Sequence, residues 1–448
     1  MTQDSQLPIP SQPALIVCKS PEQPWEVLYR TLPFSSSEQR VWWENCASLI
    51  NEYLRNTGYT TGSQYRHLLL FYAHFLPQLG PLPNKAWDNL RWRSFVNPFG
   101  PPMEFSINYQ GGARRKFRMY FDPMGSSPSD TETKDTTEFL AVRTILHRMK
   151  QFQSDIDLTW FDHFDREIGV SNQEAYQHGN ISQGCLPFDS QRCLGVDLLE
   201  ESVLAKVYFS PLRKSLAMRS DPARVMFDAI SKLDHARNIA VALTKLRTYI
   251  SSVRTQLMDP EIFCGFDCND PERSRLKIYI GWSDMCLQDV RDCWTLGGRV
   301  KGQEIERGLD LVEQMWRFMY PNSRADNEKQ PLTMVWNWEL TPHDPNPAPK
   351  AYFGFPEQSD DFASGVLTEL FTYLGWHDHT ATHQVMMKSL RTRSANYFNS
   401  IFKGITRISI AYSQKSGPYI SVYSGPIQDT KYSYPECSES FSNSNLAG

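Results

Sequence analysis

One order of predicted elements recurs five times along the chain, and it limits the folds that the chain can adopt. Two segments with apolar residues at helical spacing precede two short segments of strand character in each repeat. The predicted strands are 103–109 and 116–121, 190–197 and 203–210, 261–267 and 274–282, 332–340 and 350–355, and 405–413 and 418–424. Short turns within each pair indicate antiparallel pairing. Ten such strands can avoid exposed edges by closing into a barrel.

The helices are predicted at 35–58 and 65–75, 135–152 and 156–168, 221–234 and 236–257, 284–296 and 303–319, and 360–374 and 380–402. Their amphipathic pattern suits a layer outside the strands. We therefore predict an α+β fold, a closed ten-stranded antiparallel β-barrel of five ααββ repeats with helices on the outside. It would form a single domain over residues 25–425, between flexible tails at 1–24 and 426–448 that are rich in Pro, Ser, Gln and Asn.

The composition excludes several classes of function. The net charge of −4 gives no reason to expect nucleic acid or an acidic membrane as a partner. Nine cysteines without a CxxC pair are typical of a reduced protein, and neither a signal peptide nor a long apolar span is evident. We expect a cytoplasmic protein, a monomer or a homodimer, that acts on small molecules.

The strands carry an unusual pattern on one face, since residues two apart along a strand share a face. Arg275, Lys277 and Tyr279 alternate with aliphatic residues. The second strand of each other repeat places similar residues at the same spacing: Arg118 and Tyr120, Lys206 and Tyr208, Lys350 and Tyr352, and Tyr419, Ser421 and Tyr423. No carboxylate stands at these positions. If the apolar face packs on helices, the cations face the lumen, where burial would demand a polyanion such as a diphosphate. The alternative is that these faces are merely exposed to solvent.

These residues fall within six short motifs in order at the repeat spacing: PMEFS at 102–106, RMYFDP at 118–123, KVY at 206–208, RLKIY at 275–279, PKAY at 349–352 and YISVY at 419–423. Together with the repeats they resemble the fungal dimethylallyltryptophan-synthase-type aromatic prenyltransferases, whose barrel is called the ABBA or PT fold. The resemblance spans about residues 25 to 425. It implies transfer of a dimethylallyl group from dimethylallyl diphosphate to an indole acceptor by Friedel–Crafts-type alkylation, in secondary metabolism.

The resemblance also implies roles for individual residues. The diphosphate ligands would be Arg118, Lys206, Arg275, Lys277 and Lys350, and the tyrosine shield around the allylic cation would be Tyr208, Tyr279, Tyr352, Tyr419 and Tyr423. Glu104 would accept the indole N–H as the catalytic carboxylate. No metal is expected, because five cations can stabilise the leaving diphosphate as magnesium does elsewhere.

The acceptor is less constrained. Tryptophan-specific members of the family resembled carry a lysine on the strand before the Lys-x-Tyr motif, where this chain has Cys193. A tryptophan-containing cyclic dipeptide or another indole alkaloid therefore fits better than free tryptophan, and a phenolic polyketide or tyrosine stays open. Met334 or Trp336 is expected to bound the prenyl pocket. The base that removes the ring proton is not evident.

Two other classes of function remain as alternatives. His377, His379 and His383, expected in a connection between two helices, could hold zinc in a metal-dependent hydrolase. A barrel without catalysis could bind an anionic lipid or a pigment. Neither alternative explains why successive strands each carry a cation and a tyrosine.

Overall fold

The computed structural model describes residues 22–82, 93–97, 100–125, 134–170, 188, 190–234, 236–253, 262–323, 325–355, 358–392 and 402–426. Ten strands close into a barrel with β1 paired to both β2 and β10, and every neighbouring pair is antiparallel. The strands are β1 Met103–Gln110, β2 Arg114–Phe121, β3 Arg192–Leu198, β4 Val203–Phe209, β5 Phe263–Asp267, β6 Leu276–Trp282, β7 Met334–Leu340, β8 Ala348–Gly354, β9 Phe402–Ser413 and β10 Gly417–Pro426. The predicted fold is confirmed, with each strand within a few residues of its expected place.

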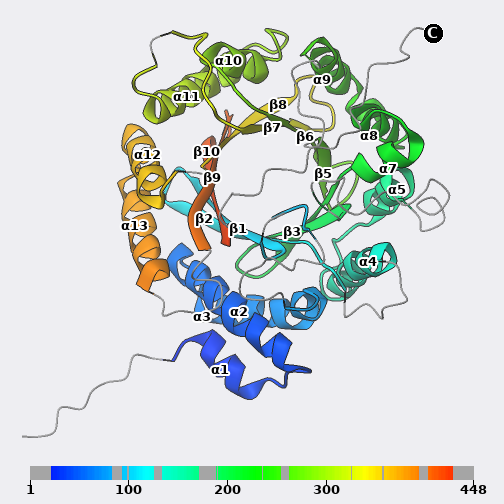
Figure 1. Ribbon diagram of the computed structural model, residues 1–448, viewed down its shortest axis with the longest axis vertical. Coiled ribbons are helices and arrows are strands. Elements are labelled where there is room, and N and C mark those ends of the chain that lie inside the picture. The colour runs from blue at the N-terminus through cyan, green and yellow to red at the C-terminus, as the bar shows by residue number, and fades with distance from the viewer. Residues whose placement is uncertain are drawn as a thin grey trace, which may run out of the picture.

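The helices surround the barrel, as the view in Figure 1 shows. Two helices near the predicted positions precede each strand pair, which confirms the five repeats, and α1 and α7 are additional. The helices are α1 Pro24–Thr31, α2 Ser37–Thr57, α3 Thr61–Leu70, α4 Lys134–Phe152, α5 Thr159–Ile168, α7 Leu212–Met218, α8 Pro222–Ser231, α9 Ala240–Val253, α10 Leu287–Thr295, α11 Gln303–Met319, α12 Asp360–Tyr373 and α13 His377–Thr392.

The main hydrophobic core lies between the outer face of the barrel and this layer of helices. Tyr53 of α2 stacks on Phe117 of β2 with 4.9 Å between ring centroids. Local signals set the ends of α2: the Ser36 hydroxyl accepts a hydrogen bond from the Gln39 amide, and Gly58 ends the helix at φ 93°. The apolar side of each strand thus faces helices, and its other side faces the lumen.

Three features differ from the sequence-based expectation. Helix α1 was not predicted; it begins at the boundary between the predicted tail and the predicted domain, where Gln23 and Glu26 cap a helix that opens with proline. The short α7 was not predicted. Helix α13 begins at His377 rather than near residue 380, so the three histidines lie on a helix and not in a connection.

Most of both predicted tails, 1–21 and 427–448, falls outside the described residues. Among the helices that the structure does describe, none combines the length and the apolar character needed to cross a membrane.

Candidate active site

The register of the barrel defines which residues face the lumen, because side chains directly opposite on antiparallel strands share a face. Arg118 of β2 lies opposite Asp197 of β3, and Lys206 of β4 lies opposite Asp267 of β5. Lys277 of β6 lies opposite Glu339 of β7. The lumen therefore holds carboxylates as well as cations. The expectation of cations without acidic partners is wrong, because the acidic residues come from the first strand of each pair.

These charges form short ion pairs. Lys206 Nζ donates a hydrogen bond to Asp197 Oδ1. Lys277 Nζ lies 3.0 Å from Asp267 Oδ1, and Arg275 Nε donates to Asp267 Oδ2 at 2.7 Å. Arg275 also reaches Glu339 at 3.3 Å.

The ion pairs keep the buried carboxyls ionised. Burial alone would raise the pKa of Asp197, but Lys206 and Arg118 outweigh it and lower that pKa to about 2. For Asp267, Lys277 and Arg275 likewise overcome burial and lower the pKa.

Arg118 and Lys350 differ from the other cations. Arg118 is buried, and its Nε and Nη2 have no hydrogen-bond partner within the part of the chain that the structure describes. Lys350 Nζ lies 5.1 Å from the ring centre of Tyr352 and 5.2 Å from that of Tyr419, and it forms no ion pair with a described carboxylate. Burial lowers the pKa of Lys350 to about 8. Both side chains are suited to an anionic ligand.

The described lumen charges give a net positive layer. Its six cations are Lys116, Arg118, Lys206, Arg275, Lys277 and Lys350, and its three carboxylates are Asp197, Asp267 and Glu339. Lys116 lies 3.7 Å from Asp197 Oδ2. The excess of three positive charges matches the roughly three negative charges of a diphosphate near neutral pH.

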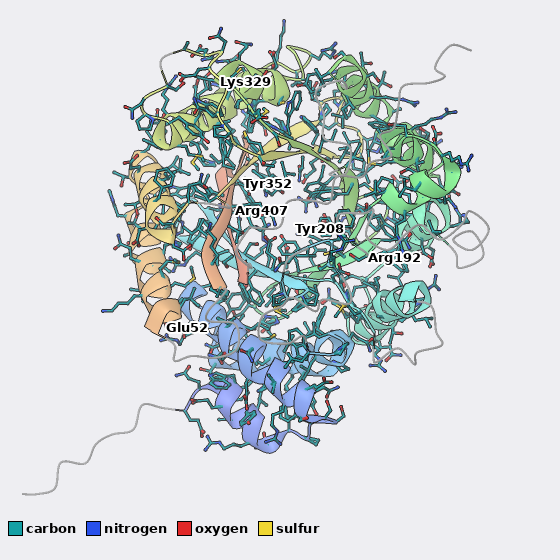
Figure 2. All side chains as sticks on the ribbon, in the orientation of Figure 1. Glu52, Arg192, Tyr208, Lys329, Tyr352 and Arg407 are labelled. Carbon is teal, nitrogen blue, oxygen red and sulfur yellow. The ribbon has the colours of Figure 1, made fainter. Side chains whose placement is uncertain are left out.

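A closed ring of five tyrosines lies next to this layer. Each tyrosine follows the cation of its strand by two residues, except on β10, and all five are buried. Neighbouring ring centroids are 5.7 to 6.1 Å apart in the order Tyr120, Tyr208, Tyr279, Tyr352, Tyr423 and back to Tyr120. Figure 2 shows Tyr208 and Tyr352 toward the middle of the barrel.

The membership of this ring differs in two places from the predicted shield. Tyr120 belongs to it although the resemblance did not include it. Tyr419 instead lies beside Lys350, in the cation layer. The two layers touch, since Lys350 Nζ lies 5.1 Å from the ring centre of Tyr352 and Arg118 Cζ lies 5.8 Å from that of Tyr423.

Two glycines make room for the ring. A Cβ atom on Gly265 would lie 2.5 Å from Cδ1 of Tyr208, and a Cβ atom on Gly195 would lie 3.1 Å from Tyr120 and from Tyr208. Gly265 and Gly195 stand directly opposite Tyr208 and Tyr120 in the barrel. The tyrosine rings lie over these glycines because no side chain occupies the space.

Glu104 lies in the tyrosine layer, opposite Tyr120. Arg407 of β9 donates a hydrogen bond from Nη2 to Glu104 Oε1, and the Thr406 hydroxyl lies 3.5 Å from the same oxygen. Burial raises the pKa of Glu104, and Arg407 partly opposes this shift. Figure 2 shows Arg407 near the barrel axis. Arg407 was missed in the sequence, because the residues two positions away from it on β9, Ile405 and Ser409, are neither cationic nor tyrosine.

The three residues predicted to line the pocket lie in different places. Cys193 packs in the lumen with the tyrosines, opposite Tyr208. Met334 and Trp336 instead lie in the core outside the barrel, so their predicted place in the pocket is wrong. Besides Glu339, the lumen positions of β7 are Val335, which packs against the tyrosines, and Asn337, whose Nδ2 lies 3.3 Å from the Tyr352 hydroxyl.

An apolar wall adjoins the tyrosine ring. Phe95 and Val96 pack against the tyrosine cluster, and Phe263 stacks on Tyr279 with 4.4 Å between centroids. Asp122 holds this wall in place, since its Oδ2 accepts hydrogen bonds from the Phe95 amide at 2.8 Å and from the Ser94 hydroxyl at 3.0 Å.

The histidines of α13 have structural contacts. His379 Nε2 lies 2.8 Å from the carbonyl oxygen of Gln110, and His383 Nδ1 lies 3.4 Å from the Tyr109 hydroxyl, both on β1. His377 is exposed. Over the described ranges, no group of three histidine, cysteine or acidic side chains could hold a metal ion. These contacts fit helix packing rather than a zinc site.

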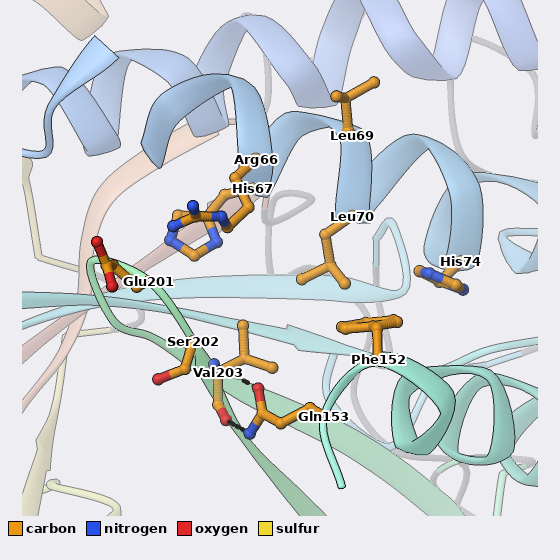
Figure 3. A pocket seen from close by; sticks show the side chains of 10 residues that line it. All are labelled: Arg66, His67, Leu69, Leu70, His74, Phe152, Gln153, Glu201, Ser202 and Val203. Atoms are coloured by element: carbon orange, nitrogen blue, oxygen red, sulfur yellow. Dashed lines mark hydrogen bonds between the residues drawn. The ribbon is translucent and has the colours of Figure 1, made fainter. Parts of the chain in front are cut away.

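A surface pocket lies outside the barrel, between α3, the end of α4 and the β3–β4 hairpin (Figure 3). Leu69, Leu70 and Phe152 form its apolar part, with His67 and His74 beside them. None of the predicted site residues lines it, so it is separate from the lumen.

A closed antiparallel barrel with a cation layer beside a tyrosine ring defines a PT-barrel prenyltransferase. The sequence profile of the family described as tryptophan dimethylallyltransferase matches residues 38–386. The chain belongs to this family, as the resemblance predicted, and it is a transferase of prenyl groups.

Individual relatives agree with this assignment. Echinulin prenyltransferase 1 of Aspergillus ruber is 31% identical over 421 residues, which cover 89% of this chain and 96% of that protein. Tryptophan dimethylallyltransferase 1 of Claviceps purpurea is 30% identical, covering 89% and 91%. Among solved structures, AnaPT from Neosartorya fischeri superimposes with a TM-score of 0.78 at 26% identity, covering 92% of this chain and all of that one. NotF in complex with brevianamide F and DMSPP superimposes with a TM-score of 0.76 at 26% identity, covering 91% of this chain and 99% of that one.

Proposed function

We propose that this enzyme transfers the dimethylallyl group of dimethylallyl diphosphate to the indole of a tryptophan-containing cyclic dipeptide or a related indole alkaloid, in secondary metabolism. The observation that carries the proposal is the pairing of a layer with three excess positive charges and a closed tyrosine ring. The first suits a diphosphate, and the second suits an allylic cation.

The cation layer would bind the donor. Arg118 and Lys350 offer donors to the diphosphate oxygens, and the paired lysines add positive charge. When the bond between the allylic carbon and the diphosphate oxygen breaks, its electron pair leaves with the diphosphate, and fixed positive charge stabilises that leaving group. The proposed diphosphate ligands are Arg118, Lys206, Arg275, Lys277 and Lys350, with Lys116 as an addition.

The tyrosine ring would stabilise the allylic cation. Tyrosine faces attract a cation through their π electrons, and a closed ring keeps water from trapping it as an alcohol. The indole π electrons then form the new carbon–carbon bond, and a ring proton leaves to restore aromaticity. Tyr419, beside Lys350, would contact the diphosphate rather than the carbocation.

Glu104 would orient the acceptor. As a buried carboxylate in the tyrosine layer, it can accept the indole N–H and offset the positive charge that develops on the ring. Cys193 in the lumen, without a lysine there, supports an acceptor other than free tryptophan. NotF, one of the similar structures, holds brevianamide F, and AnaPT is described as an indole diterpene prenyltransferase.

The proposal includes activity without a metal, because the cations supply the charge that magnesium would. It also includes a cytoplasmic enzyme, monomeric or homodimeric, whose one barrel domain spans residues 25–425.

A product-mass assay tests the proposal. Purified protein is incubated with dimethylallyl diphosphate, chelator and either tryptophan, tryptophan-containing cyclic dipeptides, tyrosine or simple phenols. We expect the mass of one C5 unit to be added to a cyclic dipeptide. Product formed only on tyrosine or a phenol would contradict the proposed indole acceptor. Activity that requires added magnesium would reject the metal-free mechanism.

A further inference from the structure

Arg407 occupies a distinct position in the lumen. It lies on β9 opposite Tyr423 of β10, and its guanidinium carbon is 5.7 Å from the centre of that tyrosine ring. Glu104 lies on β1, the other neighbour of β10. The hydrogen bond from Arg407 to Glu104 therefore spans β10 and passes beside Tyr423.

The two side chains differ in accessibility. The Arg407 side chain is 35% exposed, whereas that of Glu104 is 11% exposed. A guanidinium presents its N–H groups in a planar fork, and the exposed part of Arg407 borders the more buried Glu104. A molecule that approaches Glu104 thus also meets N–H donors of Arg407.

The charge of the pair selects the kind of oxygen that it can bind. Glu104 and Arg407 together are neutral, so a carboxylate on the ligand would gain from Arg407 and be repelled by Glu104. A neutral carbonyl oxygen avoids this repulsion and still accepts a hydrogen bond. Further groups around Glu104 are Arg118 and Tyr120 on β2, Tyr423 on β10 and Thr406 on β9.

We propose that Arg407 determines acceptor specificity: Glu104 accepts the indole N–H while Arg407 donates to a neutral carbonyl oxygen on the same molecule. The couple would favour indoles with an amide side chain, such as a cyclic dipeptide, over indoles without a carbonyl. This inference rests on the proposed function, since it assumes an indole in the lumen.

Equilibrium binding separates the inference from the reaction. Calorimetry with a tryptophan-containing cyclic dipeptide and with 3-methylindole, both in the presence of inorganic diphosphate, gives the ratio of the two affinities. For Arg407→Gln we expect this ratio to fall by about tenfold or more, the loss of one hydrogen bond to a charged group. Arg407→Lys should keep only part of the preference for the dipeptide, because lysine lacks the planar fork of N–H groups.

Two further variants test whether a change in the affinity ratio is due to Arg407 itself. Glu104→Gln should weaken both ligands and leave their ratio nearly unchanged, because both carry the indole N–H. Arg307→Gln is the matched control: Arg307 is an exposed arginine that contacts β9 from outside, through the Tyr412 hydroxyl. It should alter neither affinity.

The inference is overturned if Arg407→Gln weakens both ligands equally, since Arg407 would then act only through Glu104. It is also overturned if the unaltered protein does not prefer the dipeptide. An Arg407-dependent preference without any prenylated product would support this inference and count against the proposed function instead.

Discussion

Lys206 on β4 and Asp197 on β3 form an ion pair inside the barrel, and both side chains are almost fully buried. Burial lowers the pKa of Lys206 to about 8 even though Asp197 opposes the shift. Asp197 therefore stabilises a cation that would otherwise be held in the lumen at a high desolvation cost. A diphosphate offers the same lysine a second anionic partner.

Replacing Asp197 should show how far the stability of the protein depends on an anionic partner for Lys206. Asp197→Asn leaves Lys206 without its carboxylate, so the donor-free protein should lose on the order of 3 kcal/mol of stability. Inorganic diphosphate should restore part of that loss. Thermal unfolding with and without diphosphate measures both effects, and Asp310→Asn on the exposed side of α11 is the control. An identical loss of stability with and without diphosphate would contradict the idea that diphosphate acts as a second anionic partner of Lys206.

Lys350 and Lys277 should respond differently to truncation. Lys277→Ala leaves Asp267 with one cation fewer, so both stability and donor turnover should fall. Lys350→Met removes a partly buried charge that has no described carboxylate partner, so stability should hold while the donor kcat/KM falls about ten- to hundredfold. Chemical denaturation and steady-state kinetics on the two variants give the comparison. Equal destabilisation by both would show that Lys350 has a structural role.

Donor binding should weaken at alkaline pH. The pKa values of Lys206 and Lys350 are both lowered to about 8, so each lysine is charged below that pH and neutral above it. The kcat/KM for the donor should therefore fall as pH rises through about 8, because this constant reports the free enzyme. A Lys350→Arg variant keeps its charge, and its pH profile should be flatter. A profile unchanged by Lys350→Arg would leave Lys206 as the titrating group.

Gly265 should control how well the carbocation is shielded. Gly265→Ala places a methyl group 2.5 Å from Tyr208 Cδ1, so the ring must shift. A displaced Tyr208 opens the tyrosine ring, and more donor should end as dimethylallyl alcohol. The ratio of alcohol to prenylated product measures this leakage. Gly111→Ala in the β1–β2 turn, where a Cβ meets nothing within 4 Å, should leave the ratio unchanged.

The sequence was most informative where one short-range rule decides the outcome. The two-residue period of strands gives the strand positions and the inward cations, because alternate residues must separate by face. Met334 and Trp336 show the limit of that rule. A shift of one residue in the assumed alternation turns every side chain of the strand to the other face. On β7 the alternation is hard to assign, because an apolar lumen side chain such as Val335 resembles a core residue.

Features that depend on pairing between strands were not accessible from the sequence. Asp197 and Asp267 face the cations only because of the register between β2 and β3 and between β4 and β5. The Glu104–Arg407 contact joins residues 303 positions apart. Tyr120 enters the ring, and Tyr419 stays out of it, because strands in a barrel are staggered relative to one another.

The β1–β10 seam also affects how the protein is made. Asn108 on β1 donates a hydrogen bond to the carbonyl oxygen of Ile420 on β10, 312 residues later in the chain. While the ribosome is still translating, β1 and β9 both present unpaired backbone groups, and such edges promote aggregation. The barrel can close only after the final strand has left the exit tunnel, which makes the last step of folding a long-range and slow one. A premature stop codon before Gly417 would therefore abolish the enclosed lumen itself, and not merely shorten the enzyme.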